Sequence, residues 1–277
     1  MKLLPALAFT AALLATPVLA QPAPAAGGSF EPFVGQPGKD VIWVPTPDAV
    51  INRMLDMAKV TPADFLADLG SGDGRTVIAA AKRGLRAMGV EFNPDMVALS
   101  NREATRQGVA DKVRFVNGDI FATDFTQASV VTLYLLPSLN VKLRPTLLNM
   151  KAGTRVVSHA FNMGDWEPDE TATPEGRQVF LWIVPAKLAG TWTVQSGNQS
   201  RQLSLQQTYQ KVQGTLVSGG ESLSVIDAKL DGEQVRFSVL DKAGVRQDFA
   251  GRVQGNAMSG TVRTGSQGET PWSAARK

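Results

Sequence analysis

Three acidic residues each follow a short apolar segment in the first half of the chain. Asp68 comes after "FLA", Glu91 after "RAMGV" and Asp119 after "VRFVNG". The first acid opens the stretch "DLGSGDGR", whose glycines are Gly70, Gly72 and Gly74. Glycine permits positive φ and a close approach to a ligand, and the helix expected after the stretch presents free N–H groups. The stretch is therefore a candidate site for a ligand with an anionic group.

The spacing within this stretch excludes two common nucleotide sites. A dinucleotide-binding turn requires G-x-G-x-x-G, but Arg75 stands where the third glycine would fall. No G-K-[ST] follows, which excludes a phosphate-binding P-loop. Asp68, two residues before the first glycine, favours a ligand that carries an amino group over a pyrophosphate.

The later acids define the rest of the ligand. Glu91, at the end of the second expected strand, can accept hydrogen bonds from both hydroxyls of a ribose. Asp119, at the end of the third, can accept one from an exocyclic amine. An amino acid joined to a ribose and an adenine satisfies all three carboxylates, and that ligand is S-adenosylmethionine. The alternative is that the three acids only end strands or cap helices.

The elements that position these acids alternate between strand and helix patterns. Thr46 is the expected N-cap and Pro47 the first residue of a helix, and Asn93 is the expected cap of a later one. Short apolar strands separated by helices predict an α/β fold over residues 41–186, with a Rossmann-like, doubly wound, mostly parallel sheet. The last of these strands is expected within "RQVFLWIVPA".

The pattern changes near Lys187. Residues 187–277 contain about eight short strands of alternating apolar and polar residues, which predicts a separate all-β domain, a small antiparallel barrel or sandwich. Glycines inside "VQGTLV", "FAGRVQ" and "MSGTVR" indicate sharp bends or close backbone contacts. The region carries no catalytic signature, so we expect a structural or partner-binding domain.

The first residues have the pattern of an export signal. Residues 1–20 combine Lys2, an apolar core, and Val18 and Ala20 before a cleavage site at Gln21. We expect a cleaved signal peptide and a periplasmic protein without a membrane span, followed by a Pro/Ala/Gly-rich linker over residues 21–40. The alternative is an uncleaved N-terminal membrane anchor.

Composition excludes several functions. The chain has no cysteine and one histidine, which excludes disulfides, thiol catalysis and a histidine-rich metal site, and we expect no metal. Its 28 basic residues are interleaved with 25 acidic ones, for a net charge of +3. Nucleic-acid binding usually requires a clustered basic face, so we expect no nucleic-acid partner.

Three motifs carry a family resemblance. "ADLGSGDGR", "GVEFNP" and "FVNGDIF" resemble those of the class I S-adenosylmethionine-dependent methyltransferases. Over roughly residues 41–185, "VPTPDAVINRML" and "LYLLPSLNVKLRPTLLNM" resemble the protein-lysine methyltransferases that include the enzyme acting on the ATP synthase c-ring protein. The resemblance implies that Asp68 and the Gly70–Gly74 backbone hold the methionine moiety and Glu91 the ribose. It also implies that Asp119 and the Ile120 backbone hold the adenine, beside Phe92.

Candidate catalytic residues follow the fourth and fifth strands. Tyr134 and His159 lie at the expected strand ends, Trp166 lies in the loop beyond, and Trp43 could close over the cofactor. The alternative for His159 is a structural hydrogen bond, and for the aromatic residues it is packing. The acids of residues 165–170 are expected to form a solvated surface, or to attract a basic substrate tail.

The expected function is therefore methyl transfer from S-adenosylmethionine to a protein lysine. Two alternatives remain. One is an exported binding protein that keeps the fold while its β domain engages a cell-envelope partner, because the methyl donor is made in the cytoplasm. The other is a small-molecule methyltransferase. The absence of an Asn-Pro-Pro-Tyr signature argues against an amino-directed nucleic-acid methyltransferase.

Overall fold

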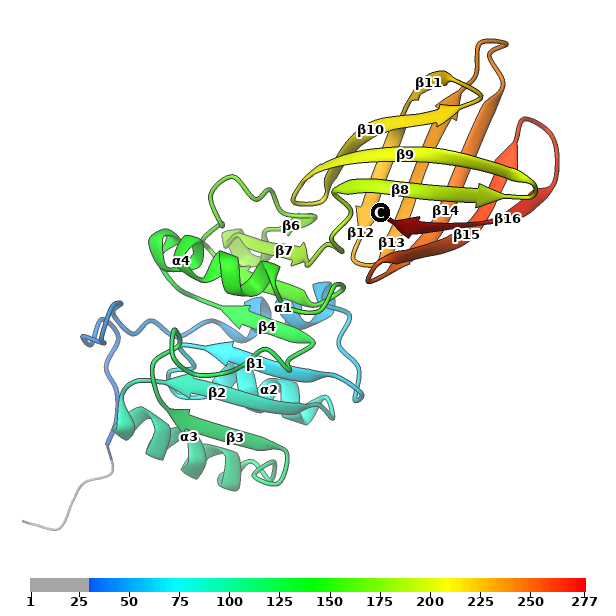
Figure 1. Ribbon diagram of the computed structural model, residues 1–277. Helices are drawn as coiled ribbons and strands as arrows, with labels where there is room; N and C mark the ends of the chain where they lie inside the picture. Colours follow the sequence, from blue (N-terminus) through cyan, green and yellow to red (C-terminus); the bar gives the residue numbers. More distant parts are fainter. Residues whose placement is uncertain (1–29) are drawn as a thin grey trace, which may run out of the picture. The chain divides into compact units, whose positions relative to one another are not determined.

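The computed structural model describes residues 30–277, which form two sheets (Figure 1). The signal peptide and most of the linker expected from the sequence lie outside the described residues. None of the helices within residues 30–277 combines the length and apolarity needed to cross a membrane.

The first sheet has seven strands in the order β3-β2-β1-β4-β5-β7-β6. The strands are β1 Phe65–Leu69, β2 Arg86–Glu91, β3 Val113–Asn117, β4 Val130–Leu133, β5 Arg155–His159, β6 Glu170–Ala172 and β7 Val179–Ile183. Strands β1 to β5 pair in parallel, which confirms the Rossmann-like, mostly parallel sheet. The strand expected within "RQVFLWIVPA" is β7, and it pairs antiparallel with β5. Strand β6 was missed, because its three residues carry no apolar pattern.

Helices cover both faces of this sheet. They are α1 Asp48–Met57, α2 Arg75–Lys82, α3 Pro94–Arg106 and α4 Pro137–Leu148, with a short 3₁₀ helix at Pro174–Gly176. Along β1, Leu66 belongs to the core that contains the buried residues of α1 and α2, whereas Leu69 belongs to the core that contains those of α4. This alternation follows from the two-residue period of a strand and leaves the strand ends free to carry the site.

The two expected helix caps have different outcomes. The side-chain oxygen of Asn93 accepts a hydrogen bond of 2.9 Å from the backbone N–H of Asp95, as predicted. The cap predicted at Thr46 is wrong: α1 begins at Asp48, its N-cap is Pro47, and no side chain caps it. The Thr46 hydroxyl instead lies 3.2 Å from Nδ1 of His159, a tertiary contact that local spacing cannot reveal.

The second sheet is antiparallel and nearly closes into a barrel. Nine strands, one more than expected, follow the order β11-β10-β9-β8-β16-β15-β14-β13-β12. They are β8 Gly190–Ser196, β9 Gln199–Thr208, β10 Lys211–Ser218, β11 Glu221–Ser224, β12 Ile226–Asp231, β13 Gln234–Leu240, β14 Arg246–Gln254, β15 Ala257–Thr264 and β16 Glu269–Arg276. The core contains Phe237 and Phe249, whose stacked ring centroids are 4.7 Å apart.

Glycine inside the barrel strands marks close backbone contacts, as the sequence indicated. A Cβ atom at Gly260 would lie 1.9 Å from the carbonyl oxygen of Ala250 on the neighbouring strand. Only glycine fits there without shifting the two strands apart.

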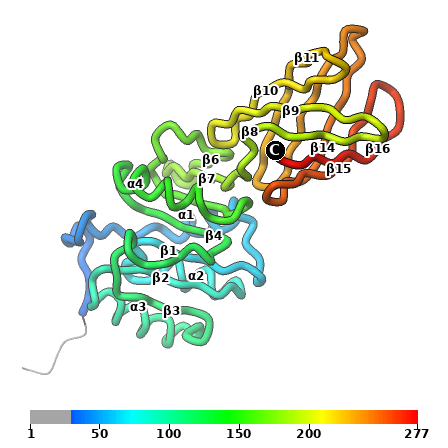
Figure 2. The backbone as a smooth tube through the Cα atoms, in the orientation of Figure 1, coloured from blue at the N-terminus to red at the C-terminus, as the bar shows by residue number. Residues whose placement is uncertain are grey.

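A hairpin precedes the first helix. Gly35 N–H donates to the Trp43 carbonyl at 2.9 Å, and Trp43 N–H donates to the Gln36 carbonyl at 2.8 Å. Figure 2 shows this segment in blue, folding back on itself. We call residues 35–43 the strap. The linker expected over residues 21–40 therefore stops short of residue 35.

Candidate cofactor site and active site

A cavity of about 720 Å³ opens at the carboxyl ends of the parallel strands. It lies where β1 and β4 are neighbours and the strand order changes direction, the position at which open α/β sheets bind ligands. The volume falls within the range of roughly 300–1,000 Å³ that is typical of small-molecule sites. The predicted cofactor residues that line it are Asp68, Gly70, Gly72, Glu91, Phe92, Asp119 and Ile120.

The glycine loop has the conformation that its composition predicted. Gly70, Gly72 and Gly74 have φ values of 79°, 54° and 78°, in the left-handed region that favours glycine. A Cβ atom at Gly72 would lie 2.7 Å from the indole nitrogen of Trp43, so the loop backbone packs directly against the strap. Gly74 does not line the cavity and instead stands at the N-cap of α2.

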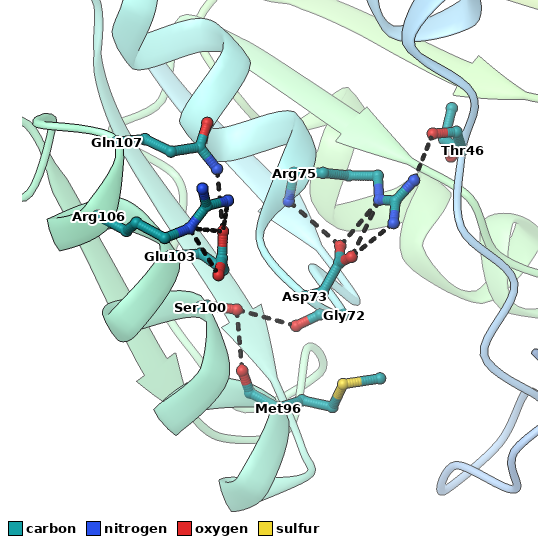
Figure 3. A network of polar contacts seen from close by, with 9 residues as sticks. All are labelled: Thr46, Gly72, Asp73, Arg75, Met96, Ser100, Glu103, Arg106 and Gln107. Carbon is teal, nitrogen blue, oxygen red and sulfur yellow. Dashed lines mark hydrogen bonds and ion pairs between the residues drawn. The ribbon is translucent and has the colours of Figure 1, made fainter. Parts of the chain in front are cut away.

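Polar contacts fix the loop on both sides (Figure 3). The Gly72 carbonyl accepts a hydrogen bond of 3.1 Å from the Ser100 hydroxyl of α3. Arg75 pairs with Asp73 at 2.6 Å, and its guanidinium also donates to the Thr46 carbonyl at 3.3 Å. The arginine that departs from the dinucleotide pattern thus ties the loop to the segment before α1.

Asp68 is the buried charge of the site. Its side chain accepts a hydrogen bond of 2.7 Å from the Thr132 hydroxyl of β4, and the residue is only 7% exposed. Burial raises the pKa of Asp68 to about 7, and the charges of Glu91 and Asp73 add to the rise. A ligand ammonium group beside this carboxylate would restore its ionised form, because an opposite charge favours ionisation.

Glu91 is held by two backbone groups. One carboxylate oxygen accepts from Gly72 N–H and the other from Asn93 N–H, each at 2.9 Å. Each oxygen keeps further acceptor capacity toward the cavity. The residues therefore fit the parts of S-adenosylmethionine: a buried carboxylate for the ammonium group, an oriented one for the ribose, and a third, Asp119, for the adenine.

Asp119 already has a cationic partner that sequence reasoning missed. Its Oδ1 accepts from Phe121 N–H at 2.9 Å, and its Oδ2 pairs with Lys39 Nζ at 2.5 Å. Lys39 belongs to the strap, 80 positions earlier in the chain. No local pattern could connect the two residues.

Tyr134 and His159 lie together, but only one reaches the cavity. Tyr134 lines it with Phe161, and their ring centroids are 6.1 Å apart. His159 does not line it: the residue is 1% exposed and its ring centroid lies 3.9 Å from that of Tyr134. Burial lowers the pKa of His159 to about 4, and the charge of Arg177 adds to the effect. The structural alternative for His159 is therefore correct, and this neutral imidazole supports Tyr134.

Trp166 lies outside the cavity, which corrects its expected role. Its side chain is fully buried, its ring packs against Trp182, and its indole N–H donates to Gln210 at 3.0 Å. The aromatic residue that does line the cavity from a loop is Trp43, as predicted.

The acids around Trp166 are exposed but paired. Asp165 accepts from the Tyr209 hydroxyl at 2.9 Å, Glu167 pairs with Lys211 at 2.7 Å, and Glu170 pairs with Arg53 at 2.9 Å. Because they already hold partners, they are a poor site for a basic substrate tail.

Comparison with known proteins agrees with this geometry. Residues 68–170 match the family model described as the ANTKMT methyltransferase domain. A protein-lysine N-methyltransferase of Saccharolobus islandicus is 42% identical over 153 residues, which cover 52% of this chain and 94% of that protein. The chain belongs to the protein-lysine methyltransferase family. It is thus an S-adenosylmethionine-dependent methyltransferase, and the predictions of fold, cofactor and enzyme class are confirmed.

Two further relatives extend the comparison. The human lysine N-methyltransferase of the ATP synthase c-ring protein is 36% identical over 145 residues, covering 52% of this chain and 61% of that protein. The crystal structure of an RNA methyltransferase from Salinibacter ruber, in complex with S-adenosyl-L-homocysteine, is 51% identical with a TM-score of 0.51. That match covers 52% of this chain and 96% of the Salinibacter chain.

The buried carboxylate predicts a pH dependence of cofactor binding. Asp68 has a pKa of about 7 without ligand, and the ligand ammonium group binds its ionised form. Affinity for S-adenosylhomocysteine should therefore fall about 20-fold from pH 7.5 to pH 5.5, as the free carboxyl becomes protonated. Calorimetry at both pH values measures the change. Asp68→Asn should bind weakly at both, and an equal fall in this variant would contradict the assignment to Asp68.

Proposed function

We propose that this enzyme methylates lysine side chains of a protein substrate. The charge of the cavity carries the proposal. Among the described residues that line it, five are acids and two are bases; the acids are Asp40, Asp68, Asp73, Glu91 and Asp119. A cavity with excess negative charge attracts a cationic methyl donor and a cationic lysine. The names of the Saccharolobus and human relatives support the same substrate class.

The cofactor roles of the site residues are part of the proposal. Asp68 and the backbone of the Gly70–Gly74 loop hold the methionine moiety, and Glu91 holds the ribose hydroxyls. Asp119 and the Ile120 backbone hold the adenine, with Phe92 beside it. When bound, S-adenosylmethionine supplies a methyl group on a positively charged sulfur, and an uncharged amine displaces the sulfur in line, forming a C–N bond as the C–S bond breaks.

Tyr134 and Phe161 form the proposed lysine-binding wall. Ring faces attract an ammonium group, so they can receive the charged side chain. Leu136 and Leu139 also line the cavity, and an apolar surrounding lowers the pKa of an amine and releases its proton to water. Held by these walls, the uncharged amine stays aligned with the methyl group.

An RNA substrate is less compatible with this cavity. The Salinibacter relative bears the name of an RNA methyltransferase. RNA approaches a protein through its phosphates, and proteins bind phosphates with clustered basic residues. Among the described lining residues only Lys39 and Arg75 are cationic, and both are paired with acids.

A labelling assay tests the proposed substrate class. The purified protein is incubated with fractionated cell extract and S-adenosylmethionine carrying a radioactive methyl group. We expect label in protein, released as methylated lysine after acid hydrolysis. Glu91→Ala is the matched control and should give no label. Label removed by ribonuclease but not by protease would contradict the proposal and favour RNA, and label in low-mass products would favour a small molecule.

Tyr134 variants test the acceptor wall. Tyr134→Ala should lower kcat about tenfold or more, because the amine loses its alignment, with little change in affinity for S-adenosylhomocysteine. Tyr134→Phe keeps the ring face and should retain most activity. Equal loss in both variants would instead assign the function to the hydroxyl group. Unchanged kcat in Tyr134→Ala would remove this residue from the acceptor site.

We also propose that residues 1–20 direct export to the periplasm. The support is the pattern of Lys2, an apolar segment and small residues before Gln21. Residues 1–40 fused to a reporter that is active only after export should give activity. The same fusion with Leu13→Arg and Leu14→Arg, which break the apolar core, should give none. An inactive unmodified fusion would contradict export, and an unprocessed active one would indicate an N-terminal anchor.

A further inference from the structure

The strap crosses the cofactor cavity from one edge to the other. Residues 36–46 all line the cavity. At one end the Trp43 indole packs on Gly72 of the glycine loop, which follows β1. At the other end the tip of the hairpin, closed by a hydrogen bond of 2.9 Å from Gly38 N–H to the Val41 carbonyl, brings Lys39 to Asp119 beyond β3. The strap therefore touches both the loop assigned to the methionine moiety and the acid assigned to the adenine.

Lys39 contacts both side chains of the adenine subsite. Its Nζ lies 2.5 Å from Asp119 Oδ2 and 5.1 Å from the centre of the Phe92 ring. The other oxygen of Asp119 already accepts from Phe121 N–H. Oδ2 is thus the oxygen best placed for the adenine amine, and it is the one that Lys39 uses.

We propose that Lys39 is a built-in competitor of the adenine 6-amino group, which holds the strap across the cavity until an adenosyl ligand replaces it at Asp119. The inference rests on the proposed assignment of Asp119 to the adenine. Both groups are N–H donors that need the same carboxylate oxygen. The exchange is feasible because the Lys39 and Asp119 side chains are 36% and 32% exposed, and ion pairs of this exposure are weak and screened by salt.

The same contact makes Lys39 a determinant of base specificity. An adenine replaces the donor that Asp119 loses when Lys39 leaves. A hypoxanthine presents an oxygen at that position, and Asp119 would then face an acceptor without a donor. A carboxylate left unpaired in this way disfavours the ligand.

Calorimetry with S-adenosylhomocysteine tests the competition without any methyl acceptor. Lys39→Met should bind about threefold more tightly than the unmodified protein at low salt. High salt should reduce this difference, because it screens the ion pair of the unmodified protein. Lys39→Arg keeps the cation and should behave like the unmodified protein.

The matched control is Lys142→Met. Lys142 lies over the Phe121 ring at 3.8 Å and acts on Asp119 only through its charge. Removing it should leave the affinity nearly unchanged. Equal or weaker binding by Lys39→Met, or the same gain from Lys142→Met, would overturn the inference.

The failure of the proposed cofactor roles would look different. S-adenosylhomocysteine would then bind no variant, or Asp119→Ala would not weaken it, and the inference would fall with the assignment. S-inosylhomocysteine provides a further check, because it should gain no more than the adenosyl ligand from Lys39→Met. A larger gain for the inosyl ligand would contradict competition for the 6-amino position.

Discussion

The site depends on one buried carboxylate at the carboxyl end of the central strand. Asp68 is shielded from water, receives one hydroxyl hydrogen bond from Thr132, and lies near two further acids, Glu91 and Asp73. Such a group is unfavourable as an ion unless a cation joins it. The glycine loop, fixed by Glu91 and Ser100, and the neighbouring strap leave room for that cation in the cavity.

Residues at strand ends were predictable because their positions depend on local pattern alone. Asp68, Glu91 and Asp119 each follow an apolar strand, and parallel strands bring their carboxyl ends to one edge. The glycine loop was equally readable, because positive φ requires glycine. Contacts between distant segments were not. Lys39 meets Asp119 through the strap, and Thr46 meets His159 instead of capping a helix.

Aromatic residues show the same limit from another side. Tyr134, Trp166 and Trp43 all looked like candidates for a pocket, and only packing separates them. Trp166 is buried against Trp182 and Gln210, whereas Tyr134 and Trp43 line the cavity. The barrel has its own aromatic core around Phe237, Phe249 and Trp272, which explains its stability as a sheet without assigning it chemistry.

The central claim is that the carboxylates at three strand ends form the S-adenosylmethionine site. Its most direct test is a calorimetric titration of S-adenosylmethionine into the purified protein at pH 7.5, compared with Glu91→Ala. One ligand should bind per chain with micromolar affinity, and the variant should bind at least about tenfold more weakly, because it loses the ribose contacts. No binding at millimolar ligand, or equal affinity in Glu91→Ala, would contradict the claim.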